Sequence, residues 1–164
     1  MKKLHLIGGP MGVGKTSVCR CLQKKLNNSV FLDGDWCWDA DPFQVTEETK
    51  AMVMDNICHL LNNFIRCTAY EHVIFCWVMH EQSIIDSILR ALDADGCDIK
   101  AVSLLCDAET LRERLLEDVR RGVRTADVIE RGLVRLMQCQ SLNTWKIDTA
   151  GKSALDVAKE IAAL

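Results

Sequence analysis

The sequence has 164 residues, of which 49% are hydrophobic and 26% are charged, with only two prolines. This length suits one compact domain with a sizeable core, and the composition excludes disordered, fibrous and collagen-like chains. The net charge of −3 does not indicate a basic surface that would bind nucleic acid or an anionic membrane. No apolar run reaches the length of a membrane span.

The first apolar stretch, Leu4 to Ile7, is interrupted by His5 and is too short for a signal peptide. The nine cysteines are an odd number without CxxC or CxxH spacing, which favours reduced thiols over disulfides or a zinc site. Both observations lead us to expect a cytoplasmic protein.

Apolar runs of strand length alternate with segments of helical periodicity along the whole chain. The runs predict five strands, at about 3–9, 29–33, 72–79, 99–106 and 144–148. The periodic segments predict helices at about 15–26, from 46 past 64, at 84–92, from 107 to 122, at 126–139 and from 153 to the end. The run at 72–79 does not alternate, which indicates a central strand buried on both faces. Such an order predicts a single α/β domain over residues 1–164, with a parallel sheet and helices on both of its faces.

A phosphate-binding loop follows the first predicted strand and opens the first predicted helix. The segment GPMGVGKT, from Gly9 to Thr16, matches the pattern G-x-x-x-x-G-K-[ST] in the structural context that this motif requires. We expect Lys15 to bridge the β- and γ-phosphates of ATP, and the Thr16 hydroxyl to bind Mg²⁺. The nucleotide contacts are predicted at Gly9, Met11, Gly12, Val13, Gly14, Lys15, Thr16 and Ser17.

Two other classes of phosphate-loop protein lack support in the sequence. The segment DTAG at 148–151 looks like the signature of a GTP switch, but it lies near the end of the chain and no NKxD follows or precedes it. A motor ATPase usually has an aspartate at the end of a hydrophobic strand, whereas the run at 72–79 is followed by His80 and Glu81. We interpret DTAG as the turn after the last strand, which leads to Ser153 as the N-cap of the last helix.

The second strand ends in FLDGDW, which places Asp33 and Asp35 at the edge where open α/β sheets bind ligands. One carboxylate could support Mg²⁺ and the other could accept the proton of an attacking hydroxyl. Either assignment is possible, and we favour Asp35 as the base and Asp33 as the group on the metal side.

Seven of the ten arginines fall between residues 112 and 135, and RRGVR at 120–124 contains a glycine between two predicted helices. This composition suits a lid, at about 119–135, that closes over ATP. Arg120, Arg121 and Arg124 are the lid candidates, with Arg120 and Arg124 as candidate catalytic groups and Arg121 and Arg131 as nucleotide contacts. We expect Arg112 and Arg114 to belong to a solvated, salt-bridged face.

Together, the phosphate loop, FLDGDW and RRGVR resemble the P-loop kinases of small metabolites and nucleotides, such as gluconate kinase, shikimate kinase, chloramphenicol phosphotransferase and adenylate kinase. The likeness covers nearly the whole chain in element order. It implies a P-loop NTPase three-layer fold with strand order 2-3-1-4-5, Mg·ATP as the phosphate donor, a mobile lid and a catalytic lid arginine among Arg120, Arg121 and Arg124.

The residue types after the second strand restrict the chemical class of the phosphoryl acceptor. The segment after the second strand contains four aspartates interleaved with Trp36, Trp38 and Phe43, and Lys50 and Arg66 are the only cations between residues 30 and 70. The shortage of arginine argues against a nucleotide acceptor and for a neutral or cationic small molecule with a hydroxyl, such as a sugar, polyol or nucleoside. We expect His80 to face the pocket floor.

The first hypothesis is therefore an ATP-dependent kinase that phosphorylates a hydroxyl of a small molecule. The alternatives are a nucleoside or nucleotide kinase, and a regulatory protein that binds a nucleotide without efficient transfer. The sequence predicts no nucleic-acid or membrane partner and does not indicate the oligomeric state.

Overall fold

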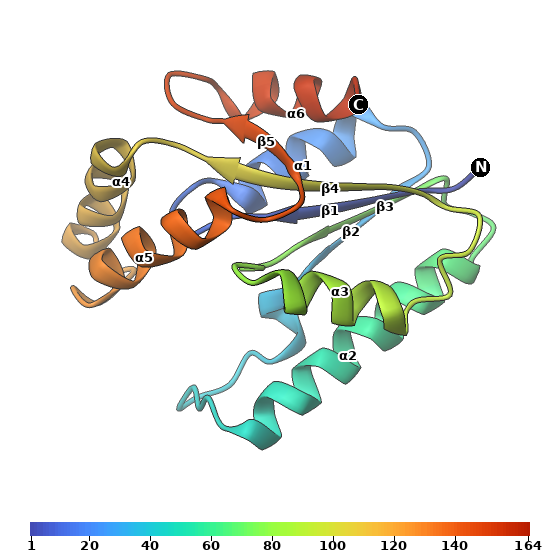
Figure 1. Ribbon diagram of the computed structural model, residues 1–164, viewed down its shortest axis with the longest axis horizontal. Helices are drawn as coiled ribbons and strands as arrows, with labels where there is room; N and C mark the ends of the chain where they lie inside the picture. Colours follow the sequence, from blue (N-terminus) through green and yellow to red (C-terminus); the bar gives the residue numbers. More distant parts are fainter.

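The computed structural model describes residues 1–164 and contains one five-stranded parallel sheet (Figure 1). The strand order is β2-β3-β1-β4-β5, which confirms the predicted order 2-3-1-4-5. The strands are β1 (Lys3–Gly8), β2 (Ser29–Asp33), β3 (His72–Cys76), β4 (Asp98–Leu105) and β5 (Trp145–Asp148).

Helices cover both faces of this sheet, as predicted, to give three layers. In Figure 1, α1 and α6 lie on one side of the sheet, and α2 and α3 lie on the other. The pair α4 and α5 lies beyond the carboxyl ends of the strands. The helices are α1 (Lys15–Lys25), α2 (Glu47–Arg66), α3 (Gln82–Ala91), α4 (Ala108–Arg120), α5 (Val128–Gln140) and α6 (Ala154–Ala162), with a 3-10 turn η1 (Gly34–Cys37) after β2. None of the helices is both long enough and apolar enough to span a bilayer.

The central strands are buried on both faces, as the sequence of β3 predicts. In β3, Val73 and Phe75 belong to the core under α2 and α3, whereas Ile74 and Cys76 belong to the core under α1 and α6. Alternation of side chains along a strand sends neighbouring residues to opposite faces, so a strand between two cores must be apolar throughout.

The ladder of β3 ends earlier than the apolar run does. Pairing with β2 stops at Cys76 opposite Asp33, and the residues after it leave the sheet through a turn in which the Met79 N–H donates to the Trp77 carbonyl. The run 72–79 was therefore predicted too long, because Trp77 and Val78 line the site at the sheet edge and Met79 enters the core instead of extending the strand.

Three helices begin with a side-chain cap at the positions where the sequence predicts their starts. The side chains of Thr46, Asp107 and Ser153 accept hydrogen bonds from backbone N–H groups in the first turns of α2, α4 and α6. Such caps satisfy donors that have no partner inside the helix. The predicted end of α4 is also confirmed, because Gly122 follows it with a φ of 70°.

The end of α2 is held by a lysine from the start of the chain. Lys2 Nζ donates to the carbonyls of Phe64, Ile65 and Cys67 at 3.1, 2.6 and 2.6 Å. We expect Lys2→Met to lower the free energy of unfolding by about 1–3 kcal/mol, because these carbonyls lose a charged donor. Urea denaturation would measure the change. Lys3→Met is the matched control, since Lys3 Nζ makes no hydrogen bond, and an equal loss there would contradict this role for Lys2.

Candidate active site

The candidate site lies where the carboxyl ends of β1, β2 and β3 meet, which is the edge at which open α/β sheets bind ligands. A cavity of about 910 Å³ opens there. Its lining comes from the phosphate loop, from η1 and the segment that follows it, from the residues after β3, and from α4 and α5. Helices and loops from four parts of the chain thus converge on one volume.

The phosphate loop, residues 9–16, has the tight backbone that the motif predicts. Gly12 has a φ of 79°, and a Cβ atom at this position would lie 2.6 Å from Leu115 Cδ2, so only glycine fits. Lys15 Nζ donates to the carbonyls of Gly9 and Pro10 at 3.0 and 2.9 Å. Burial lowers the pKa of the Lys15 amine because it disfavours the charged ammonium, and an anionic ligand in the loop would favour the ammonium again.

Thr16 and Asp33, which the sequence places 17 residues apart, are in direct contact. Thr16 Oγ1 donates to Asp33 Oδ2 at 2.7 Å, and the other oxygen, Asp33 Oδ1, accepts from the Asp35 N–H at 3.1 Å. Hydroxyl and carboxylate oxygens are the donors that Mg²⁺ takes, usually together with water and substrate phosphates. The two side chains predicted on the metal side therefore fit this ion.

Asp35 faces the large cavity two residues after Asp33. Burial, and then the nearby carboxylate of Asp33, raise the pKa of Asp35, while Lys15 acts in the opposite direction. The Asp35 carboxylate forms no ion pair, unlike the cavity-lining carboxylate of Asp118. An unpaired carboxylate with a raised pKa, opposite a phosphate loop, is suited to accept a proton.

Gly34 separates the two aspartates for a steric reason. A Cβ atom at Gly34 would lie 2.6 Å from Cγ and Cδ1 of Trp77, which lies across the backbone of η1. We expect Gly34→Ala to lower stability by about 1–3 kcal/mol and to reduce activity, because Trp77 or η1 must move and take Asp35 with it. Thermal unfolding and a transfer assay would measure both. Gly8→Ala is the control for the stability change, because Gly8 also lacks a positive φ and a Cβ atom there would meet only ordinary contacts of 3.5 Å or more. Retained activity in Gly34→Ala would contradict this account.

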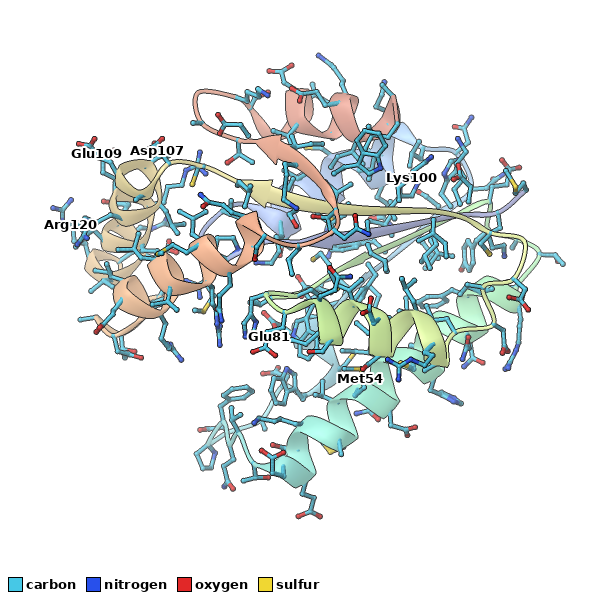
Figure 2. The ribbon with its side chains drawn as sticks, in the orientation of Figure 1. Met54, Glu81, Lys100, Asp107, Glu109 and Arg120 are labelled. Atoms are coloured by element: carbon cyan, nitrogen blue, oxygen red, sulfur yellow. The ribbon has the colours of Figure 1, made fainter.

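The lid arginines divide into two groups. Arg124 lines the cavity, where its Nε donates to Asp118 Oδ2 at 3.0 Å, and Arg131 lines it while paired with Asp127 at 3.1 Å. Arg120 and Arg121 do not line it. The Arg120 side chain is 73% exposed and lies 3.8 Å from Glu117, and Figure 2 shows it pointing away from the sheet. The structure therefore brings Arg124 and Arg131, two of the four arginines predicted for the site, to the cavity and leaves the other two in solvent.

Arg135, one helical turn after Arg131, also lines the cavity, and from the sequence both arginines could reach the adenine or the phosphates. Arg135 Nη1 lies 3.8 Å from the sulfur of Met11 in the phosphate loop, and no carboxylate pairs with it. Burial, followed by the neighbouring Arg131, lowers the pKa of Arg135. A half-buried guanidinium without a counter-ion is suited to a bound anion, and its place next to the phosphate loop points to phosphate.

Arg114 corrects an expectation, because it does not belong to a solvated face as Arg112 does. Its guanidinium donates to the Val13 carbonyl at 3.3 Å, and to Oγ1 and the carbonyl of Thr149 at 3.0 and 3.3 Å. It thereby joins the phosphate loop to the turn after β5. A usable signal was the helical period: Arg114 lies three residues after Leu111 and one before Leu115, which are both buried, and so borders the inner face of α4.

A second, smaller cavity of about 170 Å³ lies between the phosphate loop, Arg114, Thr149 and the start of α6. We expect Arg114→Ala to weaken nucleotide binding about tenfold, because it removes one wall of this cavity and frees both loops. Titration with a non-hydrolysable ATP analogue would measure the affinity, and Arg112→Ala, an exposed change on the same helix, is the control. Equal affinities for the two variants would contradict a role for Arg114 at the nucleotide.

The aromatic residues near the site have different outcomes. Trp38 lines the large cavity, as does His80, whose pKa is lowered by burial and by Arg135. Trp36 does not line the cavity: it lies edge-on to Phe31, with ring centroids 5.2 Å apart, and the Arg20 guanidinium lies 5.0 Å from its ring. Trp77, which the sequence placed in a strand, is instead part of the site.

Comparisons with known proteins agree with this architecture. A family model described as an AAA domain matches residues 6–135. Among solved structures, the tunicamycin resistance protein of Deinococcus radiodurans has a TM-score of 0.72 and 22% identity, with 99% of this chain and 95% of that chain covered. A gluconokinase from Sinorhizobium meliloti 1021 has a TM-score of 0.72 and 18% identity, over 98% and 90% of the two chains.

A third similar structure is shikimate kinase from Acinetobacter baumannii in complex with shikimate, with a TM-score of 0.66, 20% identity, and 99% and 92% of the two chains covered. A search of curated proteins found no match. These likenesses extend over nearly the full length of each chain, and at such low identity they establish the fold that the chains share.

Proposed function

The chain belongs to the AAA domain family and has the fold of the P-loop kinases, and from this premise we propose that it transfers the γ-phosphate of ATP to a hydroxyl of a small molecule. The single observation that carries the proposal is the position of Asp35. Its unpaired carboxylate faces the same cavity as the phosphate loop, beside the contact between Thr16 and Asp33.

In this proposal the two cavities hold the two ends of the donor. The small cavity beside Arg114 takes the base of the nucleotide, and the phosphate loop carries the phosphates toward the large cavity. Lys15, Arg124, Arg131 and Arg135 supply positive charge around the γ-phosphate. Thr16 and Asp33 would hold Mg²⁺, which supplies charge neutralisation to the phosphates when it is bound.

The acceptor enters the remaining volume with its hydroxyl toward Asp35. As the hydroxyl oxygen attacks the γ-phosphorus, its proton passes to Asp35, the bond from phosphorus to the β–γ bridging oxygen breaks, and ADP leaves. Arginines stabilise the negative charge on the transferred phosphoryl group better than water does, because their N–H donors are already oriented toward it. The products are ADP and a phosphate monoester.

A nucleotide acceptor is a weaker candidate. Its own phosphate would need arginines on the side of the cavity formed by residues 33–50, where Lys50 is the only cation and is already paired with Glu47 at 2.9 Å. The regulatory alternative, in which the protein binds ATP without transfer, does not explain why Asp35 faces the cavity without an ion-pair partner.

The test is a phosphoryl-transfer screen with Mg·ATP, in which ADP formation and phosphorylated product are both measured for sugars, amino alcohols, nucleosides and nucleotides. We expect acceptor-dependent ADP formation that is abolished by Lys15→Ala. Tight binding of ATP without transfer to any acceptor would refute the kinase and favour the regulatory alternative.

A further inference from the structure

The side of the cavity that faces the acceptor has an unusual set of side chains. It is formed by η1, the segment up to Lys50 and the residues after β3. We use the term acceptor wall for Asp35, Trp38, Asp39, Phe43 and Trp77, which all line the cavity. Carboxylates and aromatic rings therefore occur side by side within a few residues of the proposed point of transfer.

The three aromatic rings form one cluster. Trp38 meets Phe43 with ring centroids 4.8 Å apart at 74°, and meets Trp77 with centroids 6.1 Å apart at 75°. Phe43 remains 56% exposed although it lines the cavity. Edge-to-face packing leaves ring faces free, and the negative face of an aromatic ring attracts a cation.

The two carboxylates of the wall make no direct ion pair, although the charges of Lys15 and Arg124 act on Asp35 from a greater distance. Neither Asp35 nor Asp39 forms an ion pair, and the nearby Lys50 is paired with Glu47. The arginines of the cavity are on α5 and beside α4, next to the phosphate loop, where Asp118 and Asp127 pair with two of them. The acceptor wall is therefore left with net negative charge.

The wall is also poor in groups that recognise a neutral polyol. Between residues 33 and 84, the cavity lining contains no Asn, Gln, Ser, Thr or Tyr. The polar groups there are mainly carboxylates, which only accept hydrogen bonds when ionised, whereas an ammonium group offers three donors and no acceptor. One ligand chemistry thus satisfies both the unpaired carboxylates and the free aromatic faces.

From these observations we propose that the acceptor is an amino alcohol, in which a protonated amine lies against Trp38 and Asp39 while a hydroxyl of the same molecule lies at Asp35. This inference rests on the proposed kinase function and names its substrate class. It narrows the predicted acceptors from neutral or cationic molecules to cationic ones. The reason is that the Asp39 carboxylate and the aromatic ring faces would both attract the same protonated amine.

The test uses three amino alcohols of different size, glucosamine, 2-deoxystreptamine and phenylalaninol, each as the free amine, the N,N-dimethyl derivative and the N-acetyl derivative. The first two forms carry the positive charge, and the dimethyl form controls for added bulk. In transfer assays with Mg·ATP, we expect kcat/KM for the charged forms of at least one compound to exceed that of its N-acetyl form by about tenfold or more.

Two variants test the wall itself. Asp39→Asn and Trp38→Leu should each reduce the preference for the charged form by about fivefold or more, without changing the KM for ATP. The matched controls are Glu48→Gln, an exposed charge change near the start of α2, and Trp36→Leu, which lies outside the cavity. A preference that survives in both wall variants would overturn the proposal.

Binding is measured separately, by tryptophan fluorescence with Mg²⁺ and a non-hydrolysable ATP analogue. Binding of the charged forms without transfer would retain the ligand class and refute the kinase. Transfer to the N-acetyl forms at an equal or higher rate would retain the kinase and refute the class. If none of the three amines binds or reacts, the amino-alcohol class is refuted.

Discussion

Asp35→Asn is expected to slow phosphoryl transfer by about 10²- to 10⁴-fold while the affinity for ATP stays nearly the same. The amide keeps the shape of the side chain but cannot accept the proton of the attacking hydroxyl. The proposed nucleotide contacts involve other residues, in the phosphate loop and around Arg114. Steady-state kinetics with the best acceptor, together with titration of a non-hydrolysable ATP analogue, would separate the two effects.

The same prediction has a pH component. Burial and the neighbouring Asp33 raise the pKa of Asp35 above the ordinary value of an aspartate. The basic form is therefore lost as the pH falls through this raised pKa, and the rate of the wild-type enzyme should fall on the acid side. Asp35→Asn should lack this acid limb in its residual activity. Glu48→Gln, an exposed carboxylate outside the cavity, is the control. Unchanged transfer in Asp35→Asn would remove this residue from the mechanism.

The fold was predictable because its determinants are local and repeated. Apolar runs such as β3 need cover on both faces, and the caps at Thr46, Asp107 and Ser153 mark where helices begin. The strand order was supplied by the resemblance to known kinases, and the sheet confirms it. The end of β3 was not predictable in this way, because Trp77 and Val78 have the apolar character of strand residues but line the cavity.

The site was predictable where the motif itself fixes the geometry. The sequence places Thr16 and Asp33 near the same sheet edge, and they are in contact there. The arginines were harder, because charge density alone does not say which side of a helix faces the ligand. Arg114 lies at the border of the inner face of α4, whereas Arg120 lies five residues beyond Leu115 and is exposed. The position of Trp77 was not predictable from its own strand, because it depends on packing against Gly34 and Trp38, which are distant in the sequence.

Arg124→Ala is expected to reduce kcat by about 10²- to 10³-fold, because it removes an oriented donor from the phosphoryl group in flight. Among the lid candidates of RRGVR, only this residue lines the cavity. Its Nε is held by Asp118 at 3.0 Å, which directs the side chain, and the two terminal amino groups of its guanidinium make no hydrogen bond within the protein. Those groups are therefore free to donate to phosphate oxygens. Arg124→Lys should recover only part of the rate, since an ammonium lacks the planar fork.

Arg120→Ala is the control for this prediction, because Arg120 carries the same charge four residues earlier and its side chain is 73% exposed. We expect its kcat to remain within about twofold of the wild-type value. Single-turnover measurements at saturating Mg·ATP and acceptor would isolate the chemical step from lid opening. A large loss in Arg120→Ala with a small loss in Arg124→Ala would mean that the lid turns about Gly122 when substrates bind and exchanges the two guanidiniums at the phosphate. The reverse result would assign the lid arginine to Arg124.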